Sequence, residues 1–396
     1  MSKPLAGVRV LDLTRVLAGP FCTMILQDLG AEVLKVEIPG KGDDSRSFGP
    51  FKNERSLYFI SINRGKRSVS LNLKTQKGRT ILKQLIASHD VLIENFRPGV
   101  MDKLGLGYEA LSAEFPRLIY AASSGFGHSG PDFGKPAYDI LAQAASGLMS
   151  ITGWPDGPPT RVGCSIGDLS ASLYTTIGVL AALYQRTQTG KGQKIDVAML
   201  DCQVSLLENA LARYQVDGRN PERLGTRHPT IAPFQAYATR DDYIVVAVGN
   251  DALWKTFCTV IQRPELIDDE RFRSNGDRTH NINELNAILE PVFSARGTAE
   301  WEHILSGGGL PHSRINGIDA VLQHPQVRAR NMVVEVSDRV AGAVKIAGNP
   351  IKMSTLHEEA TRPPVPEVGQ HNDEVYGDLL GYSEEQLAEL RREGVI

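Results

Sequence analysis

Cysteine is scarce in this sequence. The 396 residues include four, Cys22, Cys164, Cys202 and Cys258, and no CxxC pair occurs among them. Such usage excludes a disulfide framework and is typical of a reducing compartment. The nine histidines are equally scattered, without an HExxH or similar ligand spacing. The sequence therefore predicts no metal site.

An excess of charge of one sign is also missing. The chain has 43 Lys and Arg residues against 46 Asp and Glu residues, a net charge of −3. This balance does not favour a nucleic-acid or membrane-surface partner. The opening residues MSKPLAGVRV lead directly into an apolar run without a signal or transit peptide, which predicts a cytoplasmic protein. The long apolar stretch at residues 169–184 is short for a membrane span and contains several Ser and Thr residues.

Three common catalytic motifs are absent or out of context. No GxxxxGK[ST] occurs, so ATP chemistry on a P-loop is not expected. GFGHSG at residues 125–130 matches GxGxxG, but Pro131 and Asp132 follow it and no long helix opens there, which argues against dinucleotide binding. GCSIG at residues 163–167 matches GxSxG, but the Pro-rich DGPPTRV precedes it instead of a buried strand. Ser165 is therefore interpreted as a turn residue.

Alternating apolar runs predict an α/β fold. The expected strands and helices lie at residues 8–13, 20–29, 32–37, 68–73, 75–88, 90–96, 117–123, 169–184 and 194–199. Strands that alternate with helices favour a parallel sheet with right-handed crossovers. Ligand groups are then expected at the carboxyl ends of the strands, at residues 14–16, 95–97 and 123–130.

A change of composition at residues 218–233, rich in Gly, Pro, Arg and His, indicates a connection to a second domain. A hairpin is expected at residues 234–249, followed by helices at about 251–261 and 283–293. Strands at 333–336 and 343–346 and a helix at 383–393 follow. We expect a large Rossmann-like domain built from both chain ends (1–217 and 331–396) and a smaller central α+β domain with its connections (218–330).

Asp168 lies where a Gly-rich turn enters the apolar helix of residues 169–184. A carboxylate there has two interpretations. It caps the helix by accepting hydrogen bonds from free backbone N–H groups, or it is a nucleophile that these groups and the helix dipole keep ionised. On this stretch alone the cap is favoured, because Asp is common at caps. Asp139 likewise has two interpretations. It caps the helix that starts near Tyr138, or it has another role.

Basic residues gather near the expected strand ends, namely Arg64, Lys66, Arg67, Lys74, Arg97 and Lys103. Each alone is best interpreted as a solvated surface residue. Together, beside buried strand ends, they would suit a phosphorylated ligand.

Taken in order, these segments resemble the class III CoA-transferases: LDLTRVLAGPF, GAEVLKVEIPGKGDDSR, NRGKRSVSLNLK, ENFRPG, LGLGYEAL, GFGHSGP, AYDILAQAASGLMSITG, GDLSAS and TGKGQKIDVAML. The resemblance covers nearly the whole chain, including EVGQHNDEV near residue 370. It implies that Asp168 is the nucleophile and that CoA is a substrate, without a cofactor. It also implies CoA contacts from Val16, Leu71, Lys74, Asn95, Phe96, Arg97, Lys103 and Tyr138.

The resemblance further implies an interlocked homodimer. It is strongest to the branch that uses dicarboxylates, which predicts succinyl-CoA as donor and an acid such as glutarate or hydroxymethylglutarate as acceptor. Arg46 or His228 is the predicted partner of the distal carboxylate. Ile38 stands where the formyl-CoA branch has Arg, so one phosphate contact is expected to differ. Two alternatives stay open at this point, an acyl-CoA racemase or epimerase of the same fold and a CoA-binding protein without chemistry.

Overall fold

The computed structural model describes residues 3–356 and 359–396, and the chain divides into two compact units. Unit 1 comprises residues 1–149, 161–217 and 325–396, and unit 2 comprises residues 150–160 and 218–324. Residues 150–160, which the sequence predicts to be part of the large domain, thus belong to unit 2.

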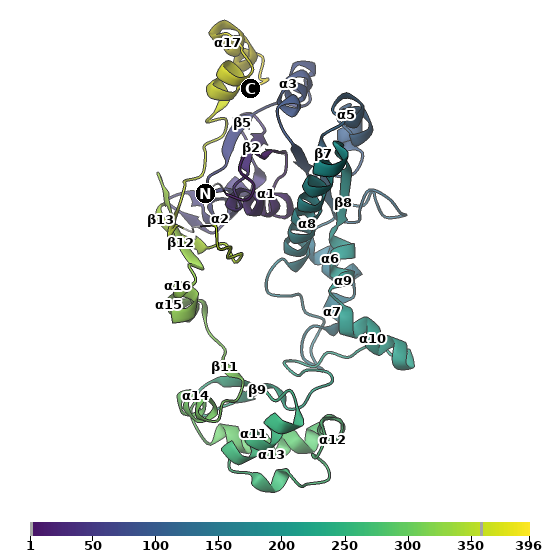
Figure 1. The fold of residues 1–396 in the computed structure, drawn as a ribbon, viewed down its shortest axis with the longest axis vertical. Helices are drawn as coiled ribbons and strands as arrows, with labels where there is room; N and C mark the ends of the chain where they lie inside the picture. The colour runs from purple at the N-terminus through teal and green to yellow at the C-terminus, as the bar shows by residue number, and fades with distance from the viewer. Residues whose placement is uncertain (1–2, 357–358) are drawn as a thin grey trace. The chain divides into compact units, whose positions relative to one another are not determined.

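The largest sheet of the described residues has six parallel strands in the order β5-β2-β1-β6-β7-β8. Figure 1 labels β5, β2, β7 and β8 of this sheet. The strands are β1 (Arg9–Asp12), β2 (Glu32–Glu37), β5 (Arg67–Ser70), β6 (Val91–Glu94), β7 (Ile119–Ser124) and β8 (Lys194–Ala198). Numbered within this sheet, the order is 3-2-1-4-5-6, that of the Rossmann fold. The predicted α/β class is confirmed. The order reverses between β1 and β6, so the crevice for a ligand is expected at their carboxyl ends.

Apolar side chains cover both faces of this sheet, as expected for parallel strands. On one face, Val10 and Val91 pack in a cluster with residues of α1 (Ala18–Asp28) and α8 (Ile166–Thr189). On the other face, Leu11 and Leu92 pack in a cluster with residues of α3 (Gln76–Ala87). The two faces thus hold separate cores, and α1 and α8 share one of them.

Helix α8 is longer than predicted and ends where Gly190 adopts φ 71°, a conformation typical of a helix C′ residue. By length and mean hydropathy (1.4) it is the one described helix that could cross a membrane. Its contacts with α1, β7 and β8 instead identify it as a core helix of unit 1. After β8 the chain forms two separate helices, α9 (Met199–Ser205) and α10 (Glu208–Asp217).

The remaining elements of unit 1 are mostly short. They are η1 (Asp44–Ser47), β3 (Phe51–Lys52), β4 (Arg55–Ser56), α2 (Leu57–Asn63), α4 (Val100–Lys103), α5 (Tyr108–Glu114), α6 (Asp139–Ala145), α16 (Pro325–Ala329), β12 (Val333–Asp338), β13 (Gly342–Ala347), β14 (Thr361–Arg362), η3 (Asp373–Leu379) and α17 (Glu384–Arg392). The short helix α7 (Leu148–Ile151) begins in unit 1 and ends in unit 2. Val375 and Tyr376 of η3 and Leu387 and Leu390 of α17 join the core cluster around Leu11. Both chain ends therefore build unit 1, as predicted.

Unit 2 is a small α+β unit. An antiparallel sheet, β11-β10-β9, contains the predicted hairpin of β9 (Phe234–Ala238) and β10 (Tyr243–Ala247) together with β11 (His312–Arg314). The other elements are α11 (Asp251–Val260), η2 (Pro264–Leu266), α12 (Asn275–His280), α13 (Ile282–Ser294), α14 (Thr298–Gly307) and α15 (Ile318–Gln323). Its core is aromatic: the Phe293 ring lies 4.7 Å from Tyr237 and 4.8 Å from Trp301, centroid to centroid.

Candidate active site

Two pockets open at the carboxyl ends of β1 and β6, where the strand order reverses. The larger, of about 740 Å³, is lined by residues that follow β1, β2, β5 and β6 and also by Gly394. The smaller, of about 400 Å³, contains Asp168. Three residues, Arg15, Phe96 and Arg97, line both pockets. The two spaces therefore share a wall, and one elongated ligand can occupy both.

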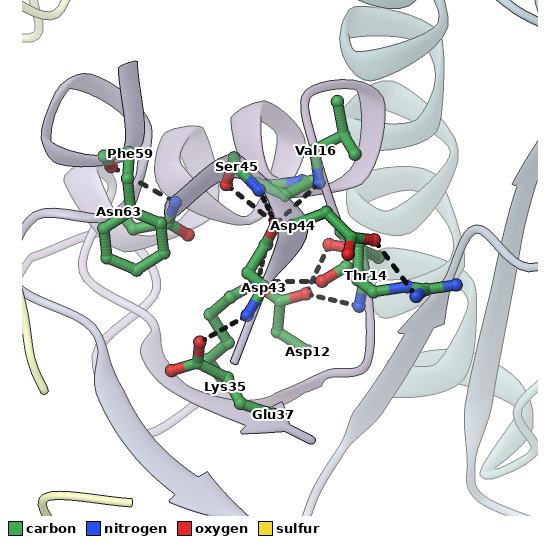
Figure 2. Close-up of polar contacts among 12 residues, drawn as sticks. Asp12, Thr14, Val16, Lys35, Glu37, Asp43, Asp44, Ser45, Phe59 and Asn63 are labelled. Atoms are coloured by element: carbon green, nitrogen blue, oxygen red, sulfur yellow. Dashed lines mark hydrogen bonds and ion pairs between the residues drawn. The ribbon is translucent and has the colours of Figure 1, made fainter. Parts of the chain in front are cut away.

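The loop after β1 is held in an unusual conformation at this wall. Val16 has φ 68°, a region that β-branched residues rarely adopt. Its N–H donates to Asp43 Oδ1 at 3.1 Å, and the neighbouring Arg15 exchanges two backbone hydrogen bonds with the Asn95 side chain at 2.9 and 2.8 Å. Lys35 Nζ, which donates to Thr14 O at 2.7 Å, also pairs with Asp43 Oδ2 at 2.8 Å. Figure 2 shows Asp43 among Lys35, Ser45 and Val16.

A second buried ion pair lies behind this loop. Lys66 Nζ is 3.1 Å from Asp12 Oδ2, and both side chains are fully buried. Burial lowers the pKa of Lys66 to about 8, although the charge of Asp12 opposes the shift. Burial also disfavours the Asp12 carboxylate, but the charges of Lys66 and Lys35 and two hydroxyl hydrogen bonds hold its pKa well below the usual range. These charges stabilise the strand ends and are not accessible to a ligand.

The basic cluster suggested by the sequence is consequently smaller than expected. Lys66 is buried in the pair just described, and Arg64 binds Asp28 through both terminal nitrogens at 2.7 and 2.8 Å. Arg67 lies at the amino end of β5 and pairs with Glu374. A position close to a strand in the sequence does not show whether the side chain lies at the amino or the carboxyl end of that strand. Of the six residues, Lys74 and Arg97 line the larger pocket.

Asp168 is the third residue of α8, whose N-cap is Ser165. It is therefore not the N-cap, and within the described residues its carboxylate accepts no hydrogen bond. Burial first, and the charge of Asp139 second, raise its pKa from 3.8 to about 7. The expectation that the helix start keeps this carboxylate ionised was wrong in direction. Ser165, with no strand before it, also lacks the geometry of an esterase nucleophile.

Asp139, and not Asp168, accepts a hydrogen bond from the first turn of α8. Its Oδ1 accepts a hydrogen bond from the Gly167 N–H of α8 at 2.7 Å, and its Oδ2 accepts one from Gln143 Nε2 at 2.7 Å. Asp139 is the first residue of α6, but it caps α8 instead of its own helix. A Cβ atom on Gly167 would lie 2.4 Å from Gln203 Nε2. A larger residue at position 167 would require the Gln203 and Asp139 side chains to shift. The hydrogen bond from Gly167 brings a second carboxylate next to Asp168.

Most of the predicted ligand contacts gather around the two pockets. Val16, Asn95, Phe96, Arg97 and Tyr138 line the smaller pocket with Asp168, whereas Leu71, Lys74, Phe96 and Arg97 line the larger. Lys103, the last residue of α4, is exposed and lines neither.

The two residues predicted to bind a distal carboxylate lie elsewhere. Arg46 donates to both oxygens of Glu37 at 2.8 and 2.7 Å and to Pro366 O at 3.0 Å. Its guanidinium is thus occupied, and it lines neither pocket. His228 belongs to unit 2, where its ring packs on Phe234 and its Nδ1 accepts a hydrogen bond from the Thr230 N–H at 3.2 Å. Its role in binding stays a prediction.

Two residues of the site were missed by the sequence analysis. Arg15 pairs with Asp44 at 3.2 Å, and its guanidinium lies 5.4 Å from the Phe96 ring centroid. Its place in the strand-end segment 14–16 was the available signal. Tyr58 of α2 lies near Asp168: burial and then the charge of Asp168 raise the pKa of its hydroxyl to about 12. No helix was predicted there, so no signal pointed to Tyr58.

This arrangement suits covalent catalysis by a carboxylate. Asp168, whose carboxylate accepts no hydrogen bond from the part of the chain that the structure describes, lines a pocket that adjoins a larger, mostly apolar one with basic residues in its walls. Within residues 3–356 and 359–396, no group of three or more His, Cys, Asp or Glu side chains is placed to hold a metal ion.

Comparison with known proteins identifies the class. Residues 5–372 match the model of CoA-transferase family III, and the chain belongs to this family. It is accordingly an enzyme that transfers CoA, as the resemblance predicted.

Named relatives and solved structures agree with this assignment. The chain is 46% identical to the acetyl-CoA:oxalate CoA-transferase of Acetobacter aceti, over 93% of each chain. It is 42% identical to the succinyl-CoA:glutarate CoA-transferase of Homo sapiens, over 100% of this chain and 90% of the relative. The crystal structure of a CAIB/BAIF family protein from Brucella suis superposes with a TM-score of 0.84 at 37% identity, covering 96% of this chain and 100% of the other.

Proposed function

We propose that this enzyme moves CoA from a donor thioester, with succinyl-CoA a good donor, to a dicarboxylic acid such as glutarate or hydroxymethylglutarate. The observation that carries the proposal is the Asp168 carboxylate, unpaired among the described residues, in a pocket that shares Arg15, Phe96 and Arg97 with a larger one. Relatives named for succinyl-CoA with glutarate or mesaconate support the choice of substrates. Assaying a panel of carboxylates with succinyl-CoA tests it.

CoA binding is assigned to the larger pocket and its shared wall. Leu71 and Phe96 offer apolar surface, and Lys74 and Arg97 offer positive charge for phosphate groups. Ile38, in place of the Arg of the formyl-CoA branch, lines this pocket with an apolar side chain. Val16, Asn95 and Tyr138 would then contact the thioester end of CoA in the smaller pocket. Lys103, which is exposed and lines neither pocket, is assigned to CoA by the family resemblance alone.

The reaction proceeds through covalent intermediates on Asp168. A carboxylate oxygen attacks the donor carbonyl carbon, the C–S bond breaks, and the products are a mixed anhydride and CoA thiolate. The thiolate attacks the aspartyl carbonyl, forming an aspartyl-CoA thioester and releasing the donor acid as carboxylate. The acceptor carboxylate then takes CoA by the reverse steps. Each intermediate divides one difficult exchange into easier steps. Because a thioester is exchanged for a thioester, no ATP is consumed.

Racemase chemistry is less compatible with the site. It needs two acid–base groups on either side of the α-carbon. Tyr138 stands where the racemase branch has His, its side chain is 76% exposed, and tyrosine is a poor base near neutral pH.

The pH dependence of the reaction should report the raised pKa of Asp168. Only the ionised carboxylate attacks, so kcat/KM with a donor should rise with pH through about 7. The Asp139→Asn variant retains an oxygen for the Gly167 N–H but loses the negative charge. Ionisation of Asp168 then becomes easier, and the rising limb should move by roughly one unit to lower pH. Steady-state pH profiles of both proteins provide the measurement, and an unchanged limb would contradict this coupling.

Arg15 is proposed to bind the distal carboxylate of the acid, in place of the occupied Arg46. Its guanidinium lies in the shared wall, and its partly exposed neighbour Asp44 is a partner that a substrate carboxylate can displace. For Arg15→Gln we expect the KM of succinate or glutarate to rise about 10-fold or more, because a hydrogen bond between charged groups is lost. Acetate, without a distal carboxylate, is the control. Equal losses with acetate and glutarate would contradict the assignment.

We also propose an interlocked homodimer. Helices α6, α8 and α9 contact one another and expose large apolar side chains, Ile140, Leu141, Leu173, Ile177, Tyr184 and Val204. Such a surface is typical of an interface, and the connection at 218–233 is long enough to pass around a second chain. Light scattering should give twice the chain mass of 43.2 kDa. Ile177→Glu should shift the protein toward monomer, and a wild-type monomer at micromolar concentration would refute the proposal.

A further inference from the structure

One buried hydroxyl group in the Asp168 pocket, that of Ser123, is left unpaired by the residues that the structure describes. Ser123, near the end of β7, is 2% exposed and lines the smaller pocket. Its Oγ has no hydrogen-bond partner among the described residues. Buried polar groups are almost always paired, and an unpaired hydroxyl destabilises the fold. By contrast, the adjacent Ser124 Oγ accepts a hydrogen bond from the Gly127 N–H at 3.0 Å.

The pleat of β7 gives the direction of this hydroxyl. Successive side chains of a strand point to opposite faces. Ile119 and Ala121 belong to the core shared with α1 and α8, whereas Tyr120 and Ala122 belong to the opposite core. Ser123 continues the first series and therefore faces α8, the helix whose first turn carries Asp168. The pleat and the pocket lining agree that Ser123 and Asp168 face the same space.

The chemistry of the pocket limits what this hydroxyl can bind. Carboxylate groups of a substrate are matched by the cationic side chains in the wall, Arg15, Arg97 and Lys135. A neutral hydroxyl is better suited to a neutral carbonyl oxygen. When Asp168 attacks a thioester, the new C–O bond pushes the carbonyl electron pair onto oxygen. A buried donor stabilises that charge more than water would, because it is already oriented.

We propose that Ser123 is a catalytic residue whose Oγ–H donates a hydrogen bond to the acyl carbonyl oxygen under attack by Asp168. No proton is transferred. The hydrogen bond strengthens as charge develops on the oxygen and weakens again when the C–S bond breaks and CoA leaves as thiolate. This role rests on the proposed transferase function and adds to it the group that receives the developing charge.

The test compares Ser123→Ala with wild type, after wild-type transfer from succinyl-CoA has been measured on its own. Without that transfer the proposed function fails, independently of Ser123. For the variant we expect kcat to fall on the order of 10²-fold with every acid of the panel, with KM nearly unchanged. The melting temperature of the unliganded variant should be equal or higher, since the lost hydroxyl has no hydrogen-bond partner in residues 3–356 and 359–396. Thr175→Val, which removes a hydroxyl paired with Ala171 O at 2.7 Å, is the control and should keep its kcat.

A spectroscopic measurement adds evidence that does not depend on turnover. In an Asp168→Asn background, the bound thioester carbonyl should absorb at higher wavenumber with Ala at position 123 than with Ser, in isotope-edited infrared difference spectra. Near-normal kcat in Ser123→Ala, an unshifted carbonyl band, or a loss of activity accompanied by a lower melting temperature would each overturn the proposal. So would a loss confined to the KM of dicarboxylates, because Ser123 would then bind the distal carboxylate.

Discussion

Replacing Asp168 by Asn is expected to lower CoA transfer about 10³-fold or more while leaving the fold and CoA binding intact. Asn is nearly isosteric, and the N-cap of α8 is Ser165, so the helix does not depend on the carboxylate. The amide cannot form an anhydride. Asp168→Glu keeps a carboxylate but displaces it by one methylene, which attack geometry tolerates poorly. Steady-state assays and isothermal titration with CoA provide the two measurements.

The melting temperature of the Asp168→Asn variant provides a second, independent test. Folding raises the pKa of Asp168 from 3.8 to about 7, so the folded protein disfavours the ionised form. This lowers the free energy of unfolding. The loss is absent in acid and grows as the pH rises toward about 7. At pH 8, Asp168→Asn should therefore melt at the same or a higher temperature than wild type.

Trapping the intermediate completes the test. Wild type incubated with succinyl-CoA and no acceptor should carry an adduct on the peptide with Asp168, and hydroxylamine should remove it. Ser165→Ala, at the GxSxG position, should retain activity and serve as the matched control. Near-normal transfer by Asp168→Asn would exclude the anhydride mechanism, and CoA binding without transfer by wild type would favour a CoA-binding protein without chemistry.

The second large effect is expected from Asp43→Ala. The substitution leaves the fully buried Lys35 without its closest carboxylate and the Val16 N–H without its acceptor. Removing one partner of a buried ion pair typically costs about 3–5 kcal/mol of unfolding free energy. Transfer should fall as well, because the loop of Val16 lines the Asp168 pocket. Urea unfolding and activity assays measure the two effects.

Two further variants separate the effect of losing a negative charge from the effect of losing the hydrogen bond that positions the loop of Val16. Asp44→Ala removes the neighbouring, partly exposed carboxylate, which pairs with Arg15 and Lys41, and should change stability by no more than about 1 kcal/mol. The double variant Lys35→Met/Asp43→Leu replaces the buried pair by apolar side chains and should recover much of the stability. It should not recover activity, because a leucine side chain at position 43 offers the Val16 N–H no acceptor. If Asp43→Ala unfolds at the wild-type urea concentration, Asp43 does not hold this loop.

The sequence predicts the sheet and its ligand edge well, since continuous apolar runs such as VRVLDL and DVLIENF are typical of parallel strands. Residues 14–16 and 95–97 are accordingly found together at the reversal of strand order. The helix α2 was missed because its sequence LYFISIN is aromatic and β-branched, a composition that favours a strand. Its N-cap Ser56, whose Oγ accepts a hydrogen bond from the Phe59 N–H, helps to fix the helix instead.

Side-chain partners were harder to predict because they depend on residues far apart in the sequence. Asp139 meets Gly167 from 28 positions away, and this contact changes the electrostatics of Asp168. Arg46 was expected to be free for a substrate, but the fold places Glu37 and Pro366 against it. The apolar pattern contains neither contact, so it gives no indication of which charges are already paired.

Residues near the end of the chain contribute to the larger pocket, and this determines when the pocket can form during protein synthesis. Residues 1–217 include Asp168 and nearly every residue of both pocket walls, but Gly394 is also part of the larger one. The Asn72 N–H donates to Val395 O at 2.8 Å, and Asn72 Nδ2 donates to Gly394 O at 3.2 Å. A growing chain on the ribosome therefore completes this wall only after residue 395 has emerged. CoA can act as a folding ligand at the full site only from that moment, after the nucleophile has long been in place.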